Sequence, residues 1–109
     1  MRRGDVVIVA DRSGDFTSKP RPAVIIQSDS FQPVDGVTVC PITSVETDAS
    51  MLRISIAPSE ELPLDRPSWI VVNKITTVLL RRISQPIGRL SADELARTTS
   101  AVALFLGIA

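Results

Sequence analysis

The sequence contains no histidine. This absence excludes Ser-His-Asp and Cys-His catalysis, and it excludes metal sites that depend on a histidine ligand. Any proton transfer must therefore use arginine, lysine, aspartate, glutamate, the one cysteine or water. The absence of histidine alone therefore restricts the catalytic mechanisms that this chain could use.

Cysteine and long apolar segments are also scarce. The one cysteine, Cys40, excludes an internal disulfide and lies in an apolar segment typical of a strand, so we expect a buried structural thiol rather than a nucleophile. No stretch approaches the roughly 18 apolar residues of a membrane span. The apolar run after Arg2 and Arg3 is too short for a signal peptide. We therefore expect a cytoplasmic protein without a membrane partner.

The chain also lacks an excess of charge of either sign. It has 12 basic and 12 acidic residues, which argues against a protein that holds nucleic acid by bulk basicity. The charges are nevertheless uneven, because residues 66–89 contain five basic side chains and no acidic one, namely Arg66, Lys74, Arg81, Arg82 and Arg89. This run is either a solvated face or a local binding surface.

Aromatic residues make up only 4% of the chain, so the core must be aliphatic. A length of 109 residues suits one domain, 1–109, that buries a core without disulfides or metals. Short apolar runs separated by Pro, Gly, Asp and Ser predict a mainly β barrel or sandwich. The expected strands are 5–10, 22–28, 37–43, 52–56, 69–72, 75–80 and a short 87–90, with long loops at 11–19 and 57–67.

The period of the pattern changes near the C-terminus. Ser91 and Glu94 have the spacing of a capping box, in which each side chain bonds the backbone of the other residue. Apolar and small side chains then follow at helical spacing, namely Leu95, Thr99, Val102, Phe105 and Leu106, and Gly107 suits the end of the helix. We expect one helix at about 91–107 that covers the core or contacts a second copy.

The segment Lys19-Pro20-Arg21-Pro22 precedes the second expected strand. Each proline disfavours the helical region for the residue before it, so Lys19 and Arg21 are held in extended geometry. A guanidinium group with few available directions suits a phosphate, because its planar fork makes two hydrogen bonds at once. The alternative is that Arg21 is a surface residue at the start of a strand.

Two other polar segments interrupt or end expected strands. In Ile42-Thr43-Ser44, the two hydroxyl groups either hold phosphate oxygens or order the following loop through its backbone. Asn73-Lys74 breaks an apolar stretch, and it marks either a strand end or bulge, or part of a site. The sequence pattern leaves both pairs of alternatives open.

Five segments together resemble the MazF/PemK toxins in order and spacing. They are Arg3-Gly4-Asp5-Val6, then Lys19-Pro20-Arg21-Pro22 with the apolar strand behind it, Pro41-Ile42-Thr43-Ser44, Lys74-Ile75-Thr76-Thr77-Val78, and Ile87-Gly88-Arg89-Leu90-Ser91 with the terminal helix. The resemblance covers nearly the whole chain. It implies a small SH3-like barrel, of the kind shared by CcdB and MazF, with a C-terminal helix.

The resemblance also implies a function. Members are homodimers that cut single-stranded RNA without a metal or cofactor, and the products carry 2′,3′-cyclic phosphate and 5′-hydroxyl ends. A cognate antitoxin blocks the RNA groove with an acidic, initially disordered tail, and operator DNA is contacted only through this antitoxin. The family's catalytic arginine and threonine fall on Arg21 and Thr43.

The remaining site residues are hypotheses that build on this resemblance. Lys74 would supply a second positive charge at the phosphate, although Asn73 stands where some members have a carboxylate. Arg12, Phe16 and Lys19 of the 11–19 loop would offer charge and a stacking face, unless this loop is merely solvated. The complete set of expected RNA-binding residues is Arg12, Phe16, Lys19, Ser44, Arg53, Asn73 and Thr76, where Arg53 and Ser55 are placed on the exposed face of their strand by alternation.

Two other functions are alternatives to RNA cleavage. CcdB toxins share the fold and poison DNA gyrase without catalysis, but they depend on a terminal Trp-Gly-Ile, and this chain ends in Leu106-Gly107-Ile108-Ala109. The other rival is an inactive member that only binds an antitoxin and its operator DNA. Which RNA sequence is cut depends on loop contacts to splayed bases, and a linear pattern does not reveal these contacts.

Overall fold

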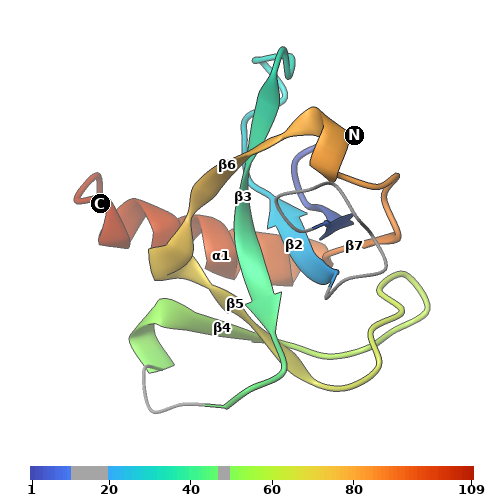
Figure 1. The fold of residues 1–109 in the computed structure, drawn as a ribbon. Coiled ribbons are helices and arrows are strands. Elements are labelled where there is room, and N and C mark those ends of the chain that lie inside the picture. The colour runs from blue at the N-terminus through green and yellow to red at the C-terminus, as the bar shows by residue number, and fades with distance from the viewer. Residues whose placement is uncertain (11–19, 47–49) are drawn as a thin grey trace.

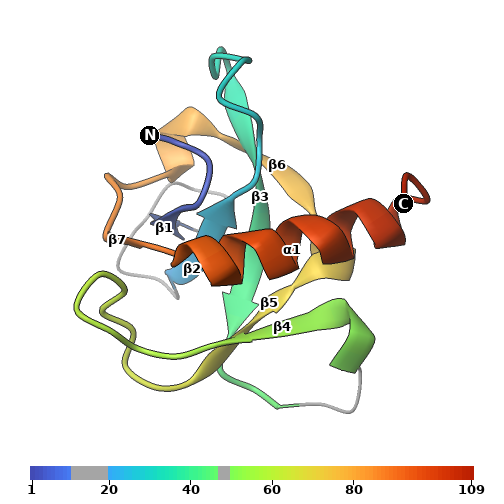
Figure 2. The ribbon, with the colours of Figure 1, turned by 180° about the vertical axis from the view of Figure 1, so that it is seen from behind.

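The computed structural model describes residues 1–10, 20–46 and 50–109. Within these ranges, the strands form one curled antiparallel sheet, and α1 (Ala92–Phe105) crosses the back of it (Figures 1 and 2). The strands are β1 (Asp5–Val9), β2 (Arg21–Ile25), β3 (Gly36–Thr43), β4 (Arg53–Ile56), β5 (Ser68–Val71), β6 (Thr76–Leu79) and β7 (Gly88–Arg89). The predicted mainly β fold with a C-terminal helix is confirmed. The predicted 11–19 loop lies outside the described residues.

β3 is the strand around which the sheet turns (Figure 1). One of its edges pairs with β2, while the other edge pairs first with β6 and then, from Ile42 onward, with β5. The short 3-10 helix η2 (Val72–Lys74) joins β5 to β6, where the partner of β3 changes. The polar pair Asn73-Lys74 therefore lies at a corner of the sheet, as the strand-end alternative requires, and a role in a site stays a prediction.

The three central strands are buried on both faces, because their alternating residues enter two different apolar clusters. On the back, Val6, Val24 and Cys40 lie in a cluster that Leu95 and Val102 of α1 cover. On the front, the neighbours of these residues along the strands join a second cluster, which comprises Val7, Ala23, Ile25, Val37, Val39 and Val78. This two-sided burial explains why the central strands read as nearly continuous aliphatic runs.

The chain after β6 curls back and closes the front cluster. The second 3-10 helix of this region, η3 (Leu80–Arg82), leads to Ile83, which forms an isolated bridge with Val9 of β1. Next to this bridge, the backbone N–H of Ala10 donates to the carbonyl oxygen of Arg82 at 2.8 Å. The sheet thus forms a half-barrel. A further 3-10 helix, η1 (Ser50–Leu52), precedes β4.

The helix begins as the sequence predicts. The N–H of Glu94 donates to Ser91 Oγ at 3.1 Å, and the N–H of Ser91 donates to Glu94 Oε1 at 2.9 Å, so the capping box is confirmed. Gly107, with φ of +77°, follows the last turn. In the described ranges, no helix has the length and apolar character needed to cross a bilayer.

The buried face of α1 differs from the predicted one in four residues. Thr98 is fully buried, whereas Thr99, Phe105 and Leu106 are exposed. The hydroxyl group of Thr98 donates to the carbonyl oxygen of Glu94 at 2.8 Å, so this polar side chain can be buried without an unpaired donor. The C-terminal end of α1 extends past the edge of the sheet (Figure 2), where Leu104, Phe105 and Leu106 are exposed.

An ion pair links β1, near the N-terminus, to β7. Asp5 Oδ1 accepts from Arg89 Nη1 at 2.7 Å, and Asp5 Oδ2 accepts from the backbone N–H of Arg2 at 2.7 Å. The Asp5 side chain is 11% exposed and that of Arg89 is 37% exposed. The pair holds the N-terminus and β7 on β1, directly before α1 begins.

We predict that Asp5→Asn lowers the free energy of unfolding by about 2 kcal/mol, because it removes the charge from a half-buried, hydrogen-bonded pair. The measurement is urea denaturation followed by circular dichroism. As a matched control, Asp93→Asn removes the charge from the exposed pair with Arg97 on α1. This second variant should lose less than about 1 kcal/mol. Equal losses in the two variants would contradict the assigned role of Asp5.

Candidate active site

Two clefts meet at Arg21 on the front of the molecule. The first, of about 510 Å³, lies where β2 begins and β3 ends, and its lining includes Arg21, Thr43, Ser44, Asp65 and Arg66. The second, of about 520 Å³, lies over the front of the sheet, and its lining includes Ala10, Arg21, Pro41, Thr76 and Arg82. Arg21 and Pro22 line both clefts. An extended, linear ligand could therefore run past Arg21 and lie in one cleft on each side of this residue.

Strand register brings Arg21 and Thr43 together. In the antiparallel pair of β2 and β3, Ala23 is opposite Pro41. Beyond this pair, β2 begins at Arg21 and β3 ends at Thr43, so both residues lie at the same end of the sheet. Both residues line the first cleft, although 22 positions separate them in the chain.

The hydroxyl group of Thr43 already has one hydrogen-bond partner, in the loop that follows β3. Thr43 Oγ1 accepts a hydrogen bond from the backbone N–H of Val45 at 3.1 Å. The hydroxyl proton remains available for a ligand oxygen. Arg53 supports the same loop from below, because its Nη1 donates to the carbonyl oxygen of Val45 at 3.0 Å. Thr43 therefore orders the loop, and its hydroxyl group can also donate to a phosphate. The two roles that the sequence pattern left open are thus compatible with each other.

The Arg21 guanidinium group is exposed and, among the described residues, makes no hydrogen bond or ion pair. The backbone of Arg21 pairs with Val9 of β1, and Pro20 and Pro22 flank it. The main chain is thus held while the charged group stays free for a ligand. A free guanidinium group beside a hydroxyl donor suits a tetrahedral or pentacoordinate phosphate, since both groups donate to its oxygens.

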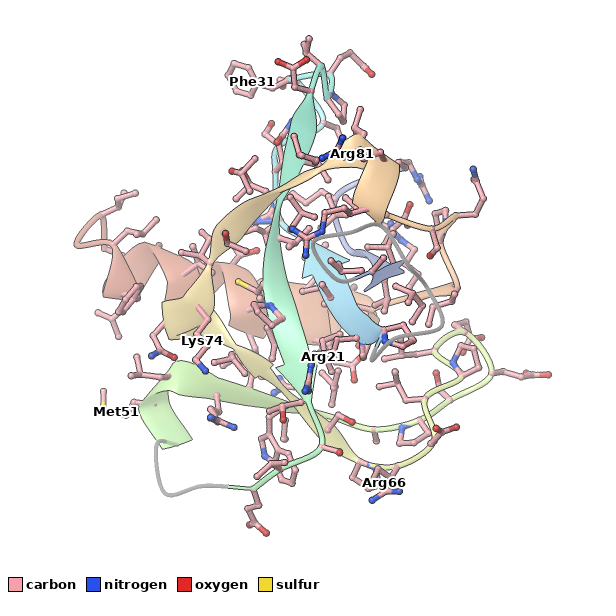
Figure 3. The ribbon with its side chains drawn as sticks, in the orientation of Figure 1. Arg21, Phe31, Met51, Arg66, Lys74 and Arg81 are labelled. Carbon is pink, nitrogen blue, oxygen red and sulfur yellow. The ribbon has the colours of Figure 1, made fainter. Side chains whose placement is uncertain are left out.

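The structure distributes the other predicted site residues over several places. Ser44 lines the first cleft and Thr76 lines the second. Arg53 is half-buried rather than exposed, because its side chain turns onto the Val45 carbonyl group. Asn73 and Lys74 are exposed on η2 and line neither cleft (Figure 3). The remaining predicted residues, Arg12, Phe16 and Lys19, lie outside the described residues.

The basic run 66–89 does not form one patch. Arg89 pairs with Asp5, and Arg82 donates from Nε and Nη2 to the carbonyl oxygen of Ala10 at 3.2 and 2.9 Å. Arg81 lies toward the opposite end of the molecule from Arg66 (Figure 3). Of the five basic residues, only Arg66 lines the first cleft and only Arg82 lines the second.

Cys40 takes no part in either cleft. Its side chain is completely buried in the back cluster, and burial raises the pKa of its thiol to about 11. A thiol in this environment stays protonated near neutral pH and is a poor nucleophile. The predicted structural role of Cys40 is confirmed. Within the described ranges, no group of three His, Cys, Asp or Glu side chains is arranged to hold a metal ion.

The sequence motifs missed Asp65 and Arg66, which line the first cleft together with Arg21 and Thr43. The sequence nevertheless contains one pattern that could have identified Arg66. Arg66 precedes Pro67, just as Arg21 precedes Pro22, so both residues have a restricted backbone at the start of a strand. The long 57–67 loop lies far from the other motifs in the sequence and offered no hint of where it folds.

Comparison with known proteins decides the family. The family model described as PemK-like, MazF-like toxin of type II toxin-antitoxin system matches residues 2–106. This chain belongs to that toxin family. A curated relative from Mycolicibacterium smegmatis, named "Probable endoribonuclease MazF", is 44% identical over 109 residues, which is all of this chain and 99% of the relative. The predicted resemblance to MazF/PemK toxins is thus confirmed.

Solved structures show that this MazF-like toxin also has the expected fold. The Mycobacterium tuberculosis toxin MazF-mt6 superposes with a TM-score of 0.77 at 20% identity, over 96% of this chain and 98% of that chain. A mycobacterial endoribonuclease in complex with its cognate antitoxin gives 0.79 at 16% identity, over 100% and 97%. MazF in a MazE-MazF complex from Deinococcus radiodurans gives 0.75 at 18% identity, over 100% and 97%.

Proposed function

We propose that this MazF-like toxin is an endoribonuclease that cleaves single-stranded RNA in the cytoplasm without a metal. The observation that carries the proposal is that Arg21, at the junction of two clefts, lines the first of them together with Thr43. The relative that is 44% identical bears the name of an endoribonuclease, which agrees with it. A reaction that uses the RNA's own 2′-hydroxyl group as nucleophile also suits a chain without histidine.

The proposed reaction balances without an external nucleophile. The ribose O2′ attacks the adjacent phosphorus and loses its proton, the P–O5′ bond breaks, and O5′ takes up a proton. The products are a 2′,3′-cyclic phosphate and a 5′-hydroxyl group. Arg21 would bind two oxygens of the pentacoordinate phosphate, and Thr43 would donate to a non-bridging oxygen. Both groups would stabilise charge that is larger in the transition state than in the substrate.

The two clefts also explain why the substrate would be single-stranded. Arg21 lies at their junction, so an RNA strand held there would place nucleotides on both sides of the cleaved bond in a cleft. A single strand can splay its bases into such recesses, whereas the bases of a duplex stay stacked and paired. With zero formal net charge, the chain must rely on local contacts of this kind.

Lys74 is the second cation of the proposal, and its position limits how it would act. It stands on η2, two residues before Thr76, which lines the second cleft. Figure 3 shows Lys74 at the edge of the molecule, to the left of Arg21. Because Lys74 lines neither cleft, it would meet an RNA strand only where the strand continues beyond the second cleft.

The proposal includes a homodimer. The last turn of α1 and the residues after it expose several large apolar side chains, Leu104, Phe105, Leu106 and Ile108. Isolated exposed apolar residues are normal, but a group on one helix end is typical of an association surface. A second copy of the chain would cover this surface, as the family resemblance implies.

The proposal also includes a cognate antitoxin with an acidic, initially disordered tail. Two of the similar solved structures contain an antitoxin or MazE, which is an observation about those proteins. In this chain, Arg21 is exposed and has no ion pair with another described residue, so it would attract acidic side chains as it attracts phosphates. The tail would then compete with RNA for the first cleft, and operator DNA would be contacted only through the antitoxin.

Arg21→Ala should lower the rate of RNA cleavage by about 100-fold or more, because it removes the main positive charge at the phosphate. Thr43→Ala should lower this rate by about 10-fold, since one neutral donor is lost. The measurement is the rate of cleavage of total RNA, with sequencing of the new 5′ ends.

The matched control for this experiment is Arg81→Ala, which removes an exposed arginine that lines neither cleft. It should cleave at the rate of the unmodified protein, and addition of the cognate antitoxin should stop both. Cleavage by Arg21→Ala at the full rate would refute the assignment of Arg21. A protein that binds antitoxin tightly yet cuts no RNA would instead be an inactive member of the family.

Lys74→Ala should lower kcat for RNA cleavage by about 10-fold, because it removes one positive charge from the path of the RNA. Lys74→Arg should keep most of the activity, since the charge remains. The measurement is steady-state cleavage of a short RNA that contains the mapped cleavage site. If Lys74→Ala cleaves this RNA at the full rate, Lys74 is a surface residue at the sheet corner and nothing more.

In solution, the chain should have twice its monomer mass of 11.8 kDa, as measured by light scattering after gel filtration. Phe105→Glu should shift the mass toward that of the monomer, because it places a charge on the apolar end of α1. Phe31→Glu is the control, since Phe31 is also an exposed phenylalanine but lies at the tip of the β2–β3 hairpin (Figure 3). A dimer that withstands Phe105→Glu would place the interface elsewhere.

A further inference from the structure

The loop between β4 and β5, residues 57–67, forms one wall of the first cleft and is anchored in the core. Leu62 is buried in the back cluster, and Leu64 packs against the same cluster. The loop also bonds to itself, because the N–H of Ser59 donates to the carbonyl oxygen of Leu62 at 2.9 Å and the N–H of Leu62 donates back at 3.2 Å. These contacts give the loop one defined conformation.

A second set of contacts fixes this loop to β7. The N–H of Arg89 donates to the carbonyl oxygen of Glu61 at 2.8 Å. At Gly88, a Cβ atom would lie 2.5 Å from that carbonyl oxygen and 2.8 Å from Pro63 Cδ, so only glycine permits this approach. The wall of the cleft therefore stands against the same strand pair that Asp5 holds together.

The C-terminal end of the loop carries Asp65 and Arg66 into the cleft that Arg21 and Thr43 line. Pro67 keeps Arg66 in extended geometry, and Ser68 Oγ donates to the carbonyl oxygen of Arg66 at 2.9 Å. Both charged side chains are exposed, and neither has an ion pair or hydrogen bond to another described side chain. Two opposite charges thus stand on a fixed wall, free to meet a ligand.

The cleft therefore offers two different chemistries at one place. The guanidinium group of Arg66, which lines the same cleft as Arg21, would bind another phosphate of the same RNA strand, since phosphates recur at every nucleotide. A carboxylate repels phosphate and accepts hydrogen bonds only, so it would face a base rather than the backbone. The exposed amino groups of splayed bases are suitable donors for it.

We propose that Asp65 and Arg66 form a second recognition element of the cleft, which binds the nucleotide next to the cleaved bond. Arg66 holds the phosphate of this nucleotide, and Asp65 accepts hydrogen bonds from the amino group of its base. The proposal rests on the proposed ribonuclease function. Adenine, cytosine and guanine carry such an amino group and uracil does not, so Asp65 disfavours uracil at this position.

The phosphate contact is tested by binding, which does not require cleavage. The probe is a fluorescent single strand of 2′-deoxynucleotides, which lacks the attacking hydroxyl group and stays intact. Arg66→Ala should weaken binding of this strand about 10-fold, as expected for loss of one charge-assisted hydrogen-bonding group. It should also reduce the slope of log Kd against log salt concentration by about 0.7, the value for one phosphate of a single strand.

Arg81→Ala is the matched control for this binding assay, because it removes an exposed arginine that lines neither cleft. Its affinity and salt slope should equal those of the unmodified protein. If Arg66→Ala behaves like Arg81→Ala, the phosphate contact is refuted, whether or not the protein cleaves RNA. If Arg66→Ala weakens binding while Arg21→Ala cleaves RNA normally, the recognition element stands and the proposed catalytic role of Arg21 fails.

The base contact is tested by mapping cleavage ends in total RNA. Asp65→Asn should keep a cleavage rate within about 10-fold of the unmodified protein on its preferred sites, and it should accept uracil about 10-fold more often at one position beside the cut. Asp35→Asn is the matched control, because Asp35 is exposed in the β2–β3 hairpin and lines neither cleft.

Two outcomes would overturn the role of Asp65. One is an unchanged base preference in Asp65→Asn, which would make the carboxylate a bystander. The other is a loss of cleavage by about 100-fold or more at all sites, with loss of the acidic limb of the pH–rate profile, which would make Asp65 the general base instead of a base reader. An unmodified protein that cuts no RNA would refute the ribonuclease function, and the binding assay would still decide the role of Arg66.

Discussion

The site depends on the way β3 shares its two edges. β2 pairs along one edge, while β6 and then β5 pair along the other, so the end of β3 is the place where the sheet divides. This division leaves the start of β2 and the end of β3 beside each other at an open end of the sheet. Arg21 and Thr43 stand there, and the β4–β5 loop can fold over the same end as a wall.

The distribution of the basic residues explains how a neutral protein can present a binding site for a polyanion. Arg89 binds Asp5, Arg82 binds the carbonyl group of Ala10, and Arg53 binds that of Val45, so these cations stabilise the fold. Arg21 and Arg66 are exposed and line the first cleft. Affinity for nucleic acid depends on where the free cations lie as well as on their number, because salt screens charges that are far from the phosphates.

The cleft is built largely before a ligand arrives. Prolines restrict the backbone at Arg21 and Arg66, the hydroxyl group of Thr43 is oriented by Val45, and the wall loop is fixed by Leu62 and by its close contact with Gly88. Groups that are already in place lose little conformational freedom when they bind, so more of their interaction energy remains for affinity and for the transition state. Asp5 contributes indirectly, since its pair with Arg89 holds β7 against β1.

The sequence by itself determined most of the strands, the capped helix and the buried Cys40, because each follows from local rules of periodicity and capping. Proline geometry singled out Arg21, but the catalytic roles proposed for Arg21 and Thr43 rest on the family resemblance. The sequence did not determine that Thr98 rather than Thr99 is buried, because this depends on the rotation of α1 against a curved sheet. Only the tertiary structure placed Lys74 at a corner away from the clefts and brought Asp65 and Arg66 beside Arg21. Strand pairing across more than 40 residues decides those positions, and a linear pattern holds no record of which strand ends will meet.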